Sequence, residues 1–328
     1  MTDSMNTEPR VASLLPSATE LVCAVGAQHA LVGRSHECDF PSEVGDVPCL
    51  TRPRVEMPQA SGAIDRSIRD TLANALTVYE VNVDALEAAR PDVIVTQDLC
   101  HVCAVSLDDV HQALRELART DVEIVSLRPT QLEHLWEDLH RVGTALGRSD
   151  EAERAAAQLE ARCAKIAESA ASLPRRSVLT IEWLDPVMVG GTWMPELVDL
   201  AGGQPLVTRP GEHAPTLSLD QLAELQPDVV LIKPCGFDLA RSETELPLLP
   251  TQLPWSTWRA VTDGQVFVAD GNAYFNRSGP RLVESLEILA AIVHSAAFPE
   301  FVERHSPSVR RVDPNLELIS LSSTGVPR

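Results

Sequence analysis

The chain carries the same sequence pattern twice, and the two copies come in the same order. Residues 20–28 (ELVCAVGAQ) are echoed by residues 196–204 (ELVDLAGGQ), and residues 83–95 (VDALEAARPDVIV) by residues 219–231 (LDQLAELQPDVVL). A helical segment that leads through Pro-Asp into an apolar, β-branched run is typical of an α/β unit. We therefore expect an α/β protein with two similar lobes and a cleft between them, a preferred place for a small ligand.

Size and charge narrow the classes of partner. The chain has 328 residues, of which 44% are hydrophobic, enough for two ordinary domains with buried cores. Its formal net charge of −20 argues against a nucleic-acid footprint or a basic membrane-surface patch. We expect a monomer that binds a small molecule and no nucleic acid.

The first residues carry no recognisable export signal. Residues 1–10 lack a basic segment leading into an apolar core, and no apolar stretch reaches about 18 residues. We therefore expect a cytoplasmic protein that does not span a membrane, with a periplasmic or cell-surface location as the alternative if the true start lies elsewhere. The seven cysteines are an odd number, which in an unexported chain indicates free thiols or metal ligands rather than disulfides.

The order of predicted elements divides the chain into four regions. An N-terminal α/β lobe occupies residues 10–128, linking helices occupy 129–174, a C-terminal α/β lobe occupies 175–298, and a polar surface tail occupies 299–328. The link includes a helix over residues 150–171 without Gly or Pro, about 33 Å long. Its place between the repeated halves favours a stiff connector, although a plain surface helix has the same composition. Ser17 and Glu20 predict a capping box at the start of the first helix.

Aromatic residues gather where the strands of both lobes are predicted to end. Ligands of alternating β/α units bind beyond the carboxyl ends of the strands. Only 4% of the chain is aromatic, yet six aromatic residues fall in these loops: Phe40, Trp183, Trp193, Phe237, Tyr274 and Phe275. Such a set would hold a flat, largely apolar ligand by area burial and stacking, with Ser17, Thr192 and Asn276 as polar contacts. The alternative is that these aromatic side chains only close the strand ends against their own lobe.

The glycine turn Gly190-Gly191-Thr192 precedes a predicted helix in the second lobe. Its backbone N–H groups could bind an anion such as phosphate or carboxylate. A tight turn with no ligand explains the same residues.

The densest group of candidate metal ligands is Cys100-His101-Val102-Cys103, in the loop after a predicted strand. Thiolate and imidazole suit zinc, iron or cobalt, and His36 and Cys38, at the end of another strand of the same lobe, could complete a four-ligand set. The CxxC spacing also allows a redox-active thiol. Two small cysteines that pack a turn are a third explanation, without chemistry.

Motifs spread along most of the chain resemble one family. They are Leu14-Leu15-Pro16-Ser17-Ala18-Thr19-Glu20, Pro91-Asp92-Val93-Ile94, Gly190-Gly191-Thr192-Trp193, Asp270-Gly271-Asn272-Ala273-Tyr274-Phe275 and Arg277-Ser278-Gly279-Pro280-Arg281. Over about residues 10–295 the chain is similar to the cobalamin-binding branch of the periplasmic binding proteins of ABC importers, whose relatives carry iron–siderophore complexes, haem or metals. The resemblance implies two Rossmann-like lobes joined by one long rigid helix, with the ligand cleft between the lobes.

The resemblance also implies a permease partner. A carboxylate on each lobe docks on the permease in this family, and by position these are Asp84 and Asp220, each seven residues before the Pro of the repeated Pro-Asp. Asp84 also fits a helix N-cap, and Asp220 the first turn after Ser218, so helix starts explain both without a partner. His101 becomes the candidate axial ligand to cobalt. The lack of an export signal and the Cys-His-Val-Cys loop point to a subgroup, a cytosolic corrinoid or metal carrier.

The first hypothesis is therefore a binding protein, not an enzyme, for a corrinoid (cobalamin-like) or related metal chelate held between two lobes and delivered to an ABC transporter. The alternative is a cytosolic zinc- or iron-binding protein, or a metal-dependent enzyme that uses the Cys100–Cys103 loop with Glu37 or Asp98 as base. A thiol redox protein is a third, weaker hypothesis.

Overall fold

The computed structural model describes residues 8–54, 58–73, 78–98, 106–117 and 119–322, and the chain forms two compact units. Unit 1 contains Arg66–Pro129, Glu133–Gln158 and the described part of Met1–Met57. Unit 2 contains Pro58–Asp65, Thr130–Leu132 and the described part of Leu159–Arg328. The chain therefore passes between the units several times, and not only in the long helix α6 (Ser149–Ala170), which was predicted as the connector.

The first half of the chain contains these elements: β1 (Val11–Ser13), α1 (Pro16–Ala24), η1 (Gln28–Ala30), β2 (Leu31–Arg34), η2 (Ser42–Asp46), β3 (Thr51–Pro53), α2 (Ser61–Ala73), β4 (Tyr79–Val81), α3 (Val83–Ala89), β5 (Val93–Gln97), α4 (Leu107–Glu116), β6 (Glu123–Leu127), α5 (Glu133–Ala145) and α6. The second half contains these: β7 (Arg176–Leu184), β8 (Val187–Val189), α7 (Met194–Leu200), β9 (Gly203–Pro205), α8 (Leu219–Ala223), β10 (Val229–Ile232), α9 (Leu239–Thr244), η3 (Leu246–Leu248), α10 (Leu249–Gln252), α11 (Arg259–Thr262), β11 (Val266–Ala269), α12 (Leu282–Val293), α13 (Pro299–His305), β12 (Val309–Val312) and β13 (Leu318–Ser320).

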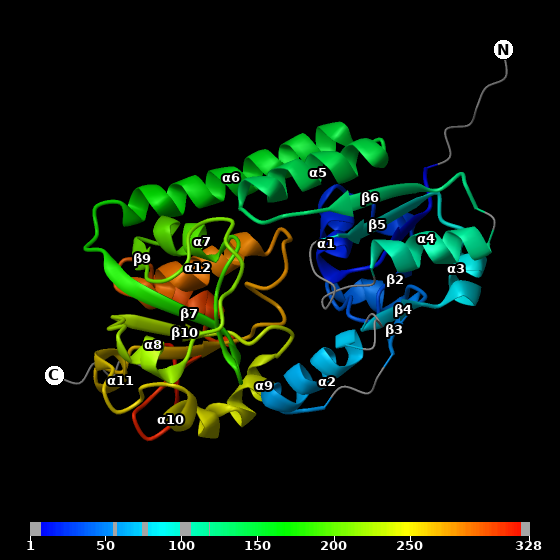
Figure 1. Ribbon diagram of the computed structural model, residues 1–328. Coiled ribbons are helices and arrows are strands. Elements are labelled where there is room, and N and C mark those ends of the chain that lie inside the picture. Colours follow the sequence, from blue (N-terminus) through cyan, green and yellow to red (C-terminus); the bar gives the residue numbers. More distant parts are fainter. Residues whose placement is uncertain (1–7, 55–57, 74–77, 99–105, 118, 323–328) are drawn as a thin grey trace, which may run out of the picture. The chain divides into compact units, whose positions relative to one another are not determined.

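Unit 1 is built on a parallel sheet with the strand order β2-β1-β5-β6. Every residue of β5 is buried, as expected for a parallel strand that helices cover on both faces. On one face, Leu86 of α3 and Leu114 of α4 pack with Ile94. Helices α1 and α5 cover the other face (Figure 1). Because α5 packs on α1 and β6, it belongs to unit 1, whereas it was predicted as part of the link.

Unit 2 has a mixed sheet whose central strands β7, β10 and β11 run parallel. Strand β9 pairs in parallel with the start of β7, and β8 pairs antiparallel with its end. On one face, Leu179 and Ile181 of β7 pack with Leu249 and Trp258. Helices α7 and α12 lie on the opposite face (Figure 1). The carboxyl ends of the three parallel strands therefore meet at one edge of this unit.

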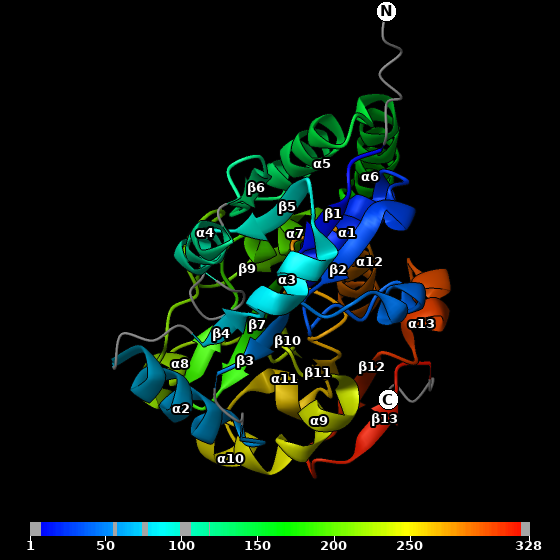
Figure 2. The same cartoon turned by 90° about the vertical axis from the view of Figure 1, so that its right-hand side faces the viewer.

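Residues 299–322 do not form the predicted surface tail. Helix α13 leads into a β12–β13 hairpin (Figure 2), and β12 pairs antiparallel with β11. Val309 and Val312 are buried there, so this segment completes the sheet of unit 2. Two arginines between these valines, Arg310 and Arg311, break the apolar alternation by which a strand is recognised in sequence.

The sequence repeat corresponds to repeated local structure. Gly26 follows α1 and Gly202 follows α7, and both have positive φ angles, 75° and 78°. Glycine is the residue that adopts this conformation without a steric penalty, so the same residue ends the equivalent helix in each unit.

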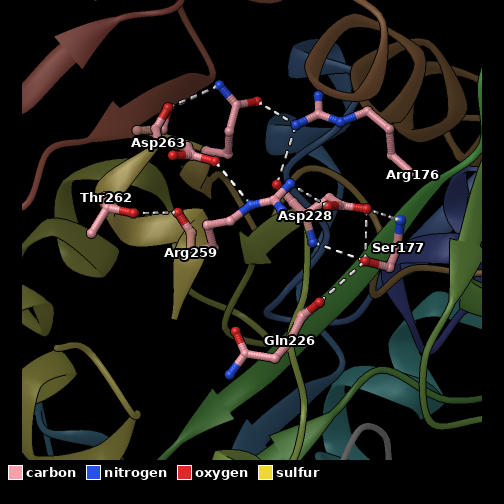
Figure 3. Close-up of polar contacts among 9 residues, drawn as sticks. Arg176, Ser177, Gln226, Asp228, Arg259, Thr262 and Asp263 are labelled. Atoms are coloured by element: carbon pink, nitrogen blue, oxygen red, sulfur yellow. Dashed lines mark hydrogen bonds and ion pairs between the residues drawn. The ribbon is translucent and has the colours of Figure 1, made fainter. Parts of the chain in front are cut away.

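In both sheets, the aspartate of the repeated Pro-Asp motif joins the amino ends of two neighbouring parallel strands by a hydrogen bond. The Asp92 carboxylate accepts a hydrogen bond from the backbone N–H of Arg10 at 2.8 Å, just before β1. In unit 2, Asp228 accepts from the backbone N–H of Ser177 at 2.8 Å (Figure 3). Hydrogen bonds, first that from the Ser177 backbone, hold the pKa of Asp228 below its usual range. Arg259 adds an ion pair at 3.3 Å.

Two predicted helix starts were wrong. Leu15 is the N-cap of α1, and its aliphatic side chain cannot accept a hydrogen bond, while Pro16 in the first turn leaves one N–H fewer to satisfy. The predicted capping box of Ser17 is therefore absent. Asn82, not Asp84, caps α3, with its side chain accepting from the backbone N–H of Ala85 at 3.1 Å.

Candidate functional site

A buried lysine organises the carboxyl ends of β7, β10 and β11 in unit 2. Lys233 follows β10 directly, and only 1% of it is exposed. Its Nζ donates to Glu182 Oε2 at 3.0 Å and to Asn276 Oδ1 at 2.7 Å. Because Glu182 lies in β7 and Asn276 follows β11, one ammonium group joins loops from three strands. A buried ammonium requires such partners, since an unpaired charge would be strongly destabilising.

The loop after β11 is held from several sides. The Asn276 side-chain amide also donates to the backbone carbonyls of Lys233 at 3.1 Å and Gly271 at 2.8 Å. The neighbouring Phe275 has a φ of 68°, which is uncommon for a bulky residue. Its carbonyl accepts from Trp193 Nε1 at 2.7 Å, and its N–H donates to Ser285 Oγ at 2.9 Å. These bonds offset the cost of that backbone conformation.

The predicted aromatic contacts of unit 2 divide into buried and half-buried side chains. Trp193, Phe237 and Phe275 are at most 7% exposed, so they pack inside their own unit. Trp183 and Tyr274 are half-buried. The Trp183 ring meets Phe237 edge to face, with 5.3 Å between centroids. A buried ring thus supports a partly exposed ring at the strand ends, an arrangement that can hold the flat face of a ligand.

The Gly190–Thr192 turn packs tightly rather than opening toward an anion. The N–H of Thr192 donates to Glu212 O at 2.6 Å, and Gly190 N–H donates to Thr180 O at 2.9 Å. A Cβ on Gly191 would overlap the backbone of 212–214. Thr192 Oγ1 donates back to Gly191 O at 2.8 Å. The turn therefore supports the explanation that needs no ligand.

The two residues of unit 1 that were predicted to contact the ligand, Ser17 and Phe40, differ in exposure. Ser17 lies in the first turn of α1 and is 3% exposed. Phe40 follows β2 and is 45% exposed, which makes it one of two large hydrophobic side chains described as exposed, together with Leu219. An exposed phenylalanine in a loop that follows a parallel strand is a candidate ligand contact.

The predicted metal site is supported by none of its described members. Cys100, His101 and Cys103 lie outside the described residues. Cys38 is 3% exposed, and its Sγ accepts from Thr19 Oγ1 at 3.0 Å. His36 Nδ1 lies 2.7 Å from Thr51 Oγ1, and burial, aided by Arg34, lowers the pKa of His36. Among the described residues no group of three His, Cys, Asp or Glu side chains could hold a metal ion.

The two carboxylates predicted to face a permease are both exposed at helix starts. Asp84 lies in the first turn of α3, and Asp220 in the first turn of α8. Ser218 caps α8 in a capping box with Gln221. Since other residues cap both helices, neither aspartate is needed for that purpose.

Sequence reasoning missed Lys233 and its partner Glu182. A signal was present, because the chain has only two lysines among its 27 Lys and Arg residues, and one of them follows the apolar run of β10. Composition so poor in lysine marks this position as unusual. Its partners, however, come from strands far apart in the sequence.

The fold is that of a known class of proteins. Residues 11–273 match the family described as periplasmic binding protein. The chain belongs to this family, and it is accordingly a substrate-binding protein rather than an enzyme. No helix within the described ranges combines the length and hydrophobicity that crossing a bilayer requires.

Individual relatives cover most of the chain. A vitamin B12-binding protein of Photorhabdus laumondii subsp. laumondii is 21% identical over 282 residues, 85% of this chain and 86% of the relative. A periplasmic heme-binding protein from Pseudomonas aeruginosa superposes with a TM-score of 0.66 at 22% identity, over 88% of this chain and 94% of its own. The periplasmic vitamin B12-binding protein BtuF of Vibrio cholerae does so with 0.61 at 18% identity, over 88% and 98%.

These findings confirm the α/β fold class and the family resemblance, and they correct one expectation. The cytoplasmic location is contradicted, because the family and the structural neighbours are periplasmic binding proteins. The expectation depended on the first residues alone, whereas the family assignment uses residues 11–273.

Proposed function

We propose that this substrate-binding protein carries a corrinoid of the cobalamin type and delivers it to an ABC permease. The observation that carries the proposal is the half-buried Trp183 ring supported by Phe237 at the carboxyl ends of β7 and β10. A corrin ring is flat with broad apolar faces, which such rings hold by stacking and area burial. The curated relatives named vitamin B12-binding protein, which span 85% or more of this chain, favour a corrinoid over haem.

The half-buried and exposed rings are the proposed principal contacts. Trp183 and Tyr274 in unit 2 and Phe40 in unit 1 have surface available to a ligand. Within unit 2, Phe237 meets Trp183 edge to face, and Phe275 meets Tyr274 edge to face with 6.5 Å between ring centroids. Trp193 donates to the Phe275 carbonyl. Ser17, Thr192 and Asn276 remain predicted polar contacts, and the amide of Asn276 is already engaged within unit 2, so it acts mainly by shaping its loop.

Two further parts of the proposal concern the cobalt and the permease. His101 is the proposed axial ligand, because a neutral imidazole is a good donor to cobalt. Asp84 and Asp220 are the proposed docking carboxylates, since both are exposed and neither caps its helix.

The ligand assignment is tested by titrating the purified protein with aquocobalamin, cyanocobalamin, hemin and ferrichrome. Visible absorbance reports binding, and thermal unfolding reports stabilisation. We expect a corrinoid to stabilise the fold by about 2.7 kcal/mol at a hundredfold excess over its dissociation constant. Stabilisation by hemin or ferrichrome with none by either corrinoid would replace the ligand class.

A matched pair of tryptophan variants tests the site. Trp183→Ala is expected to weaken corrinoid binding by about tenfold or more, as loss of a stacked ring does. Trp136, also half-buried, lies on α5 in unit 1 and is the control. Equal affinity losses for Trp183→Ala and Trp136→Ala would contradict the placement of the site.

A further inference from the structure

A short segment from the first half of the chain is built into unit 2. Pro58–Asp65 belongs to unit 2, although residues that follow it in the chain belong to unit 1. Arg241 of α9 donates from Nη2 to the carbonyls of Pro58 at 3.1 Å and Gln59 at 3.0 Å. Figure 1 shows α9 beside the start of α2. One guanidinium therefore binds two successive carbonyls just before α2 begins.

A buried carboxylate holds the first residue of α2. Ser61 donates its backbone N–H to Glu245 Oε1 at 3.2 Å and its hydroxyl to Glu245 Oε2. Ser61 is 0% and Glu245 4% exposed. The first N–H groups of a helix have no partner within the helix, and the helix dipole favours an anion there, so this carboxylate fits the position on both grounds.

Pro58–Asp65 is connected to the Trp183–Phe237 ring pair through two sets of contacts, one by way of Arg241 and one by way of Asp185. The Arg241 guanidinium carbon lies 3.9 Å from the centroid of Phe237, whose ring meets Trp183. Trp183 Nε1 donates to the carbonyl of Asp185 at 3.1 Å. The backbone of Gly62 packs so closely on the Asp185 carboxylate that a Cβ there would overlap it. The contacts thus form a closed ring, from the segment through Arg241, Phe237, Trp183 and Asp185 back to the segment.

We propose that Arg241 and Glu245 are positioning residues, which hold Pro58–Asp65 in unit 2 so that the Trp183–Phe237 pair is fixed for its ligand. The inference rests on the proposed function in taking Trp183 as a ligand contact. The planar guanidinium can stack on a ring while its N–H groups bind carbonyls from a rigid fork, a geometry that the compact ammonium of lysine does not reproduce. A ring already held in place loses less conformational freedom on binding, and this raises affinity.

The coupling is tested by a double-mutant cycle on aquocobalamin affinity. We expect Arg241→Met to weaken binding about tenfold in the wild-type background. In the Trp183→Ala background the same change should have little effect, because Arg241 acts through that ring. The control is Arg259→Met, another arginine of unit 2 that makes its ion pairs at the amino edge of the sheet. An equal loss in both Trp183 backgrounds, or no loss in either, would overturn the inference.

A second measurement needs no ligand. Hydrogen exchange of the peptide that covers 58–65 should become at least tenfold faster in Arg241→Met and in Glu245→Gln, but not in Arg259→Met. If Arg241→Met does not fold, Arg241→Lys takes its place, with the same expectation in a weaker form. Should no corrinoid bind the wild-type protein, the proposed function fails, and this exchange experiment still decides the positioning role. Unchanged exchange in Arg241→Met and Glu245→Gln would contradict it.

Discussion

Lys233 Nζ lies 3.0 Å from Glu182 Oε2 and joins the carboxyl ends of β10 and β7. Lys233→Met leaves a carboxylate and the Asn276 carbonyl without their shared donor, so we expect a loss of about 3 kcal/mol in the free energy of unfolding. Lys165, the other lysine of the chain, is exposed on α6 and provides the control. Lys165→Met should stay within about 0.5 kcal/mol of the wild type in urea unfolding. Equal effects of the two changes would contradict a structural role for the buried ion pair.

Glu287 should make stability depend on acid pH. Burial acts to raise its pKa, but hydrogen bonds from His305, Arg162 and Arg304 outweigh burial and lower the pKa to about 2. Because this lies below the usual value of 4.5, ionised Glu287 stabilises the fold above about pH 4.5, and the contribution is lost as the pH falls toward 2.

We expect Glu287→Gln to cost roughly 3 kcal/mol at pH 7 and progressively less below pH 4.5. Urea unfolding at pH 7, 5 and 3 measures the difference from wild type. Glu300→Gln, at an exposed position on α13, is the control and should show no such trend. A difference that does not change with pH would count against the ionised carboxylate as the cause.

Asp138 should give the opposite pH dependence to Glu287, because its contribution to stability is lost as the pH rises. Burial raises its pKa to about 7, against the attraction of Arg141, and the 1% exposed carboxyl has an Oδ2 with no hydrogen-bond partner among the described residues. Because its pKa is raised, the neutral Asp138 carboxyl stabilises the fold below pH 3.8, which is the usual pKa of aspartate. This stabilisation is lost as the pH rises through 7. Asp138→Asn should therefore melt at a higher temperature than wild type at pH 8 and at a similar one at pH 4. A melting temperature unchanged at pH 8, like that of the exposed control Asp84→Asn, would refute this.

Phe40 gives a direct test of the ligand surface of unit 1. Phe40→Ala removes an exposed ring, so we expect little change in stability and about a tenfold loss in corrinoid affinity. Leu219→Ala removes the second large hydrophobic side chain that is exposed among the described residues, and it should leave affinity unchanged. Isothermal titration with aquocobalamin separates the two variants. Unaltered affinity in Phe40→Ala would remove this residue from the site.

Asp84 and Asp220 should matter for transport and not for ligand capture. The double variant Asp84→Ala, Asp220→Ala removes two exposed carboxylates, so the corrinoid dissociation constant should stay the same. Uptake of labelled cobalamin by cells that depend on this protein should fall at least tenfold, because docking on basic permease residues is lost. Asp199→Ala with Glu224→Ala, at other exposed positions of unit 2, is the control. Normal uptake by the docking variant would refute the assignment.

Much of the fold follows from patterns within a few residues. The strands β1, β5, β7 and β11 coincide with apolar runs, and a glycine follows both α1 and α7, so each of these signals lies within a few neighbouring residues. The short elements β3, β4 and β8 were not foreseen, since their residues do not belong to a longer apolar run such as the one that contains β1.

The site was predicted only as a set of loops. Parallel topology places the carboxyl ends of β7, β10 and β11 together, so it could be foreseen that Trp183, Phe237 and Tyr274 lie near these strand ends. The exposure of these side chains could not be predicted, because the neighbours that bury Phe237 and leave Trp183 half-buried come from other parts of the chain.

The sequence by itself determined the duplicated α/β architecture, because the two copies repeat the local signals for strand, helix end and strand entry, including Gly26 with Gly202 and Asp92 with Asp228. Only the tertiary structure decided that Lys233 is buried, that the end of the chain adds β12 to a sheet, and that Ser61 is held by Glu245, 184 residues away. Such contacts join residues with no common local pattern, so they exist only once the chain has folded.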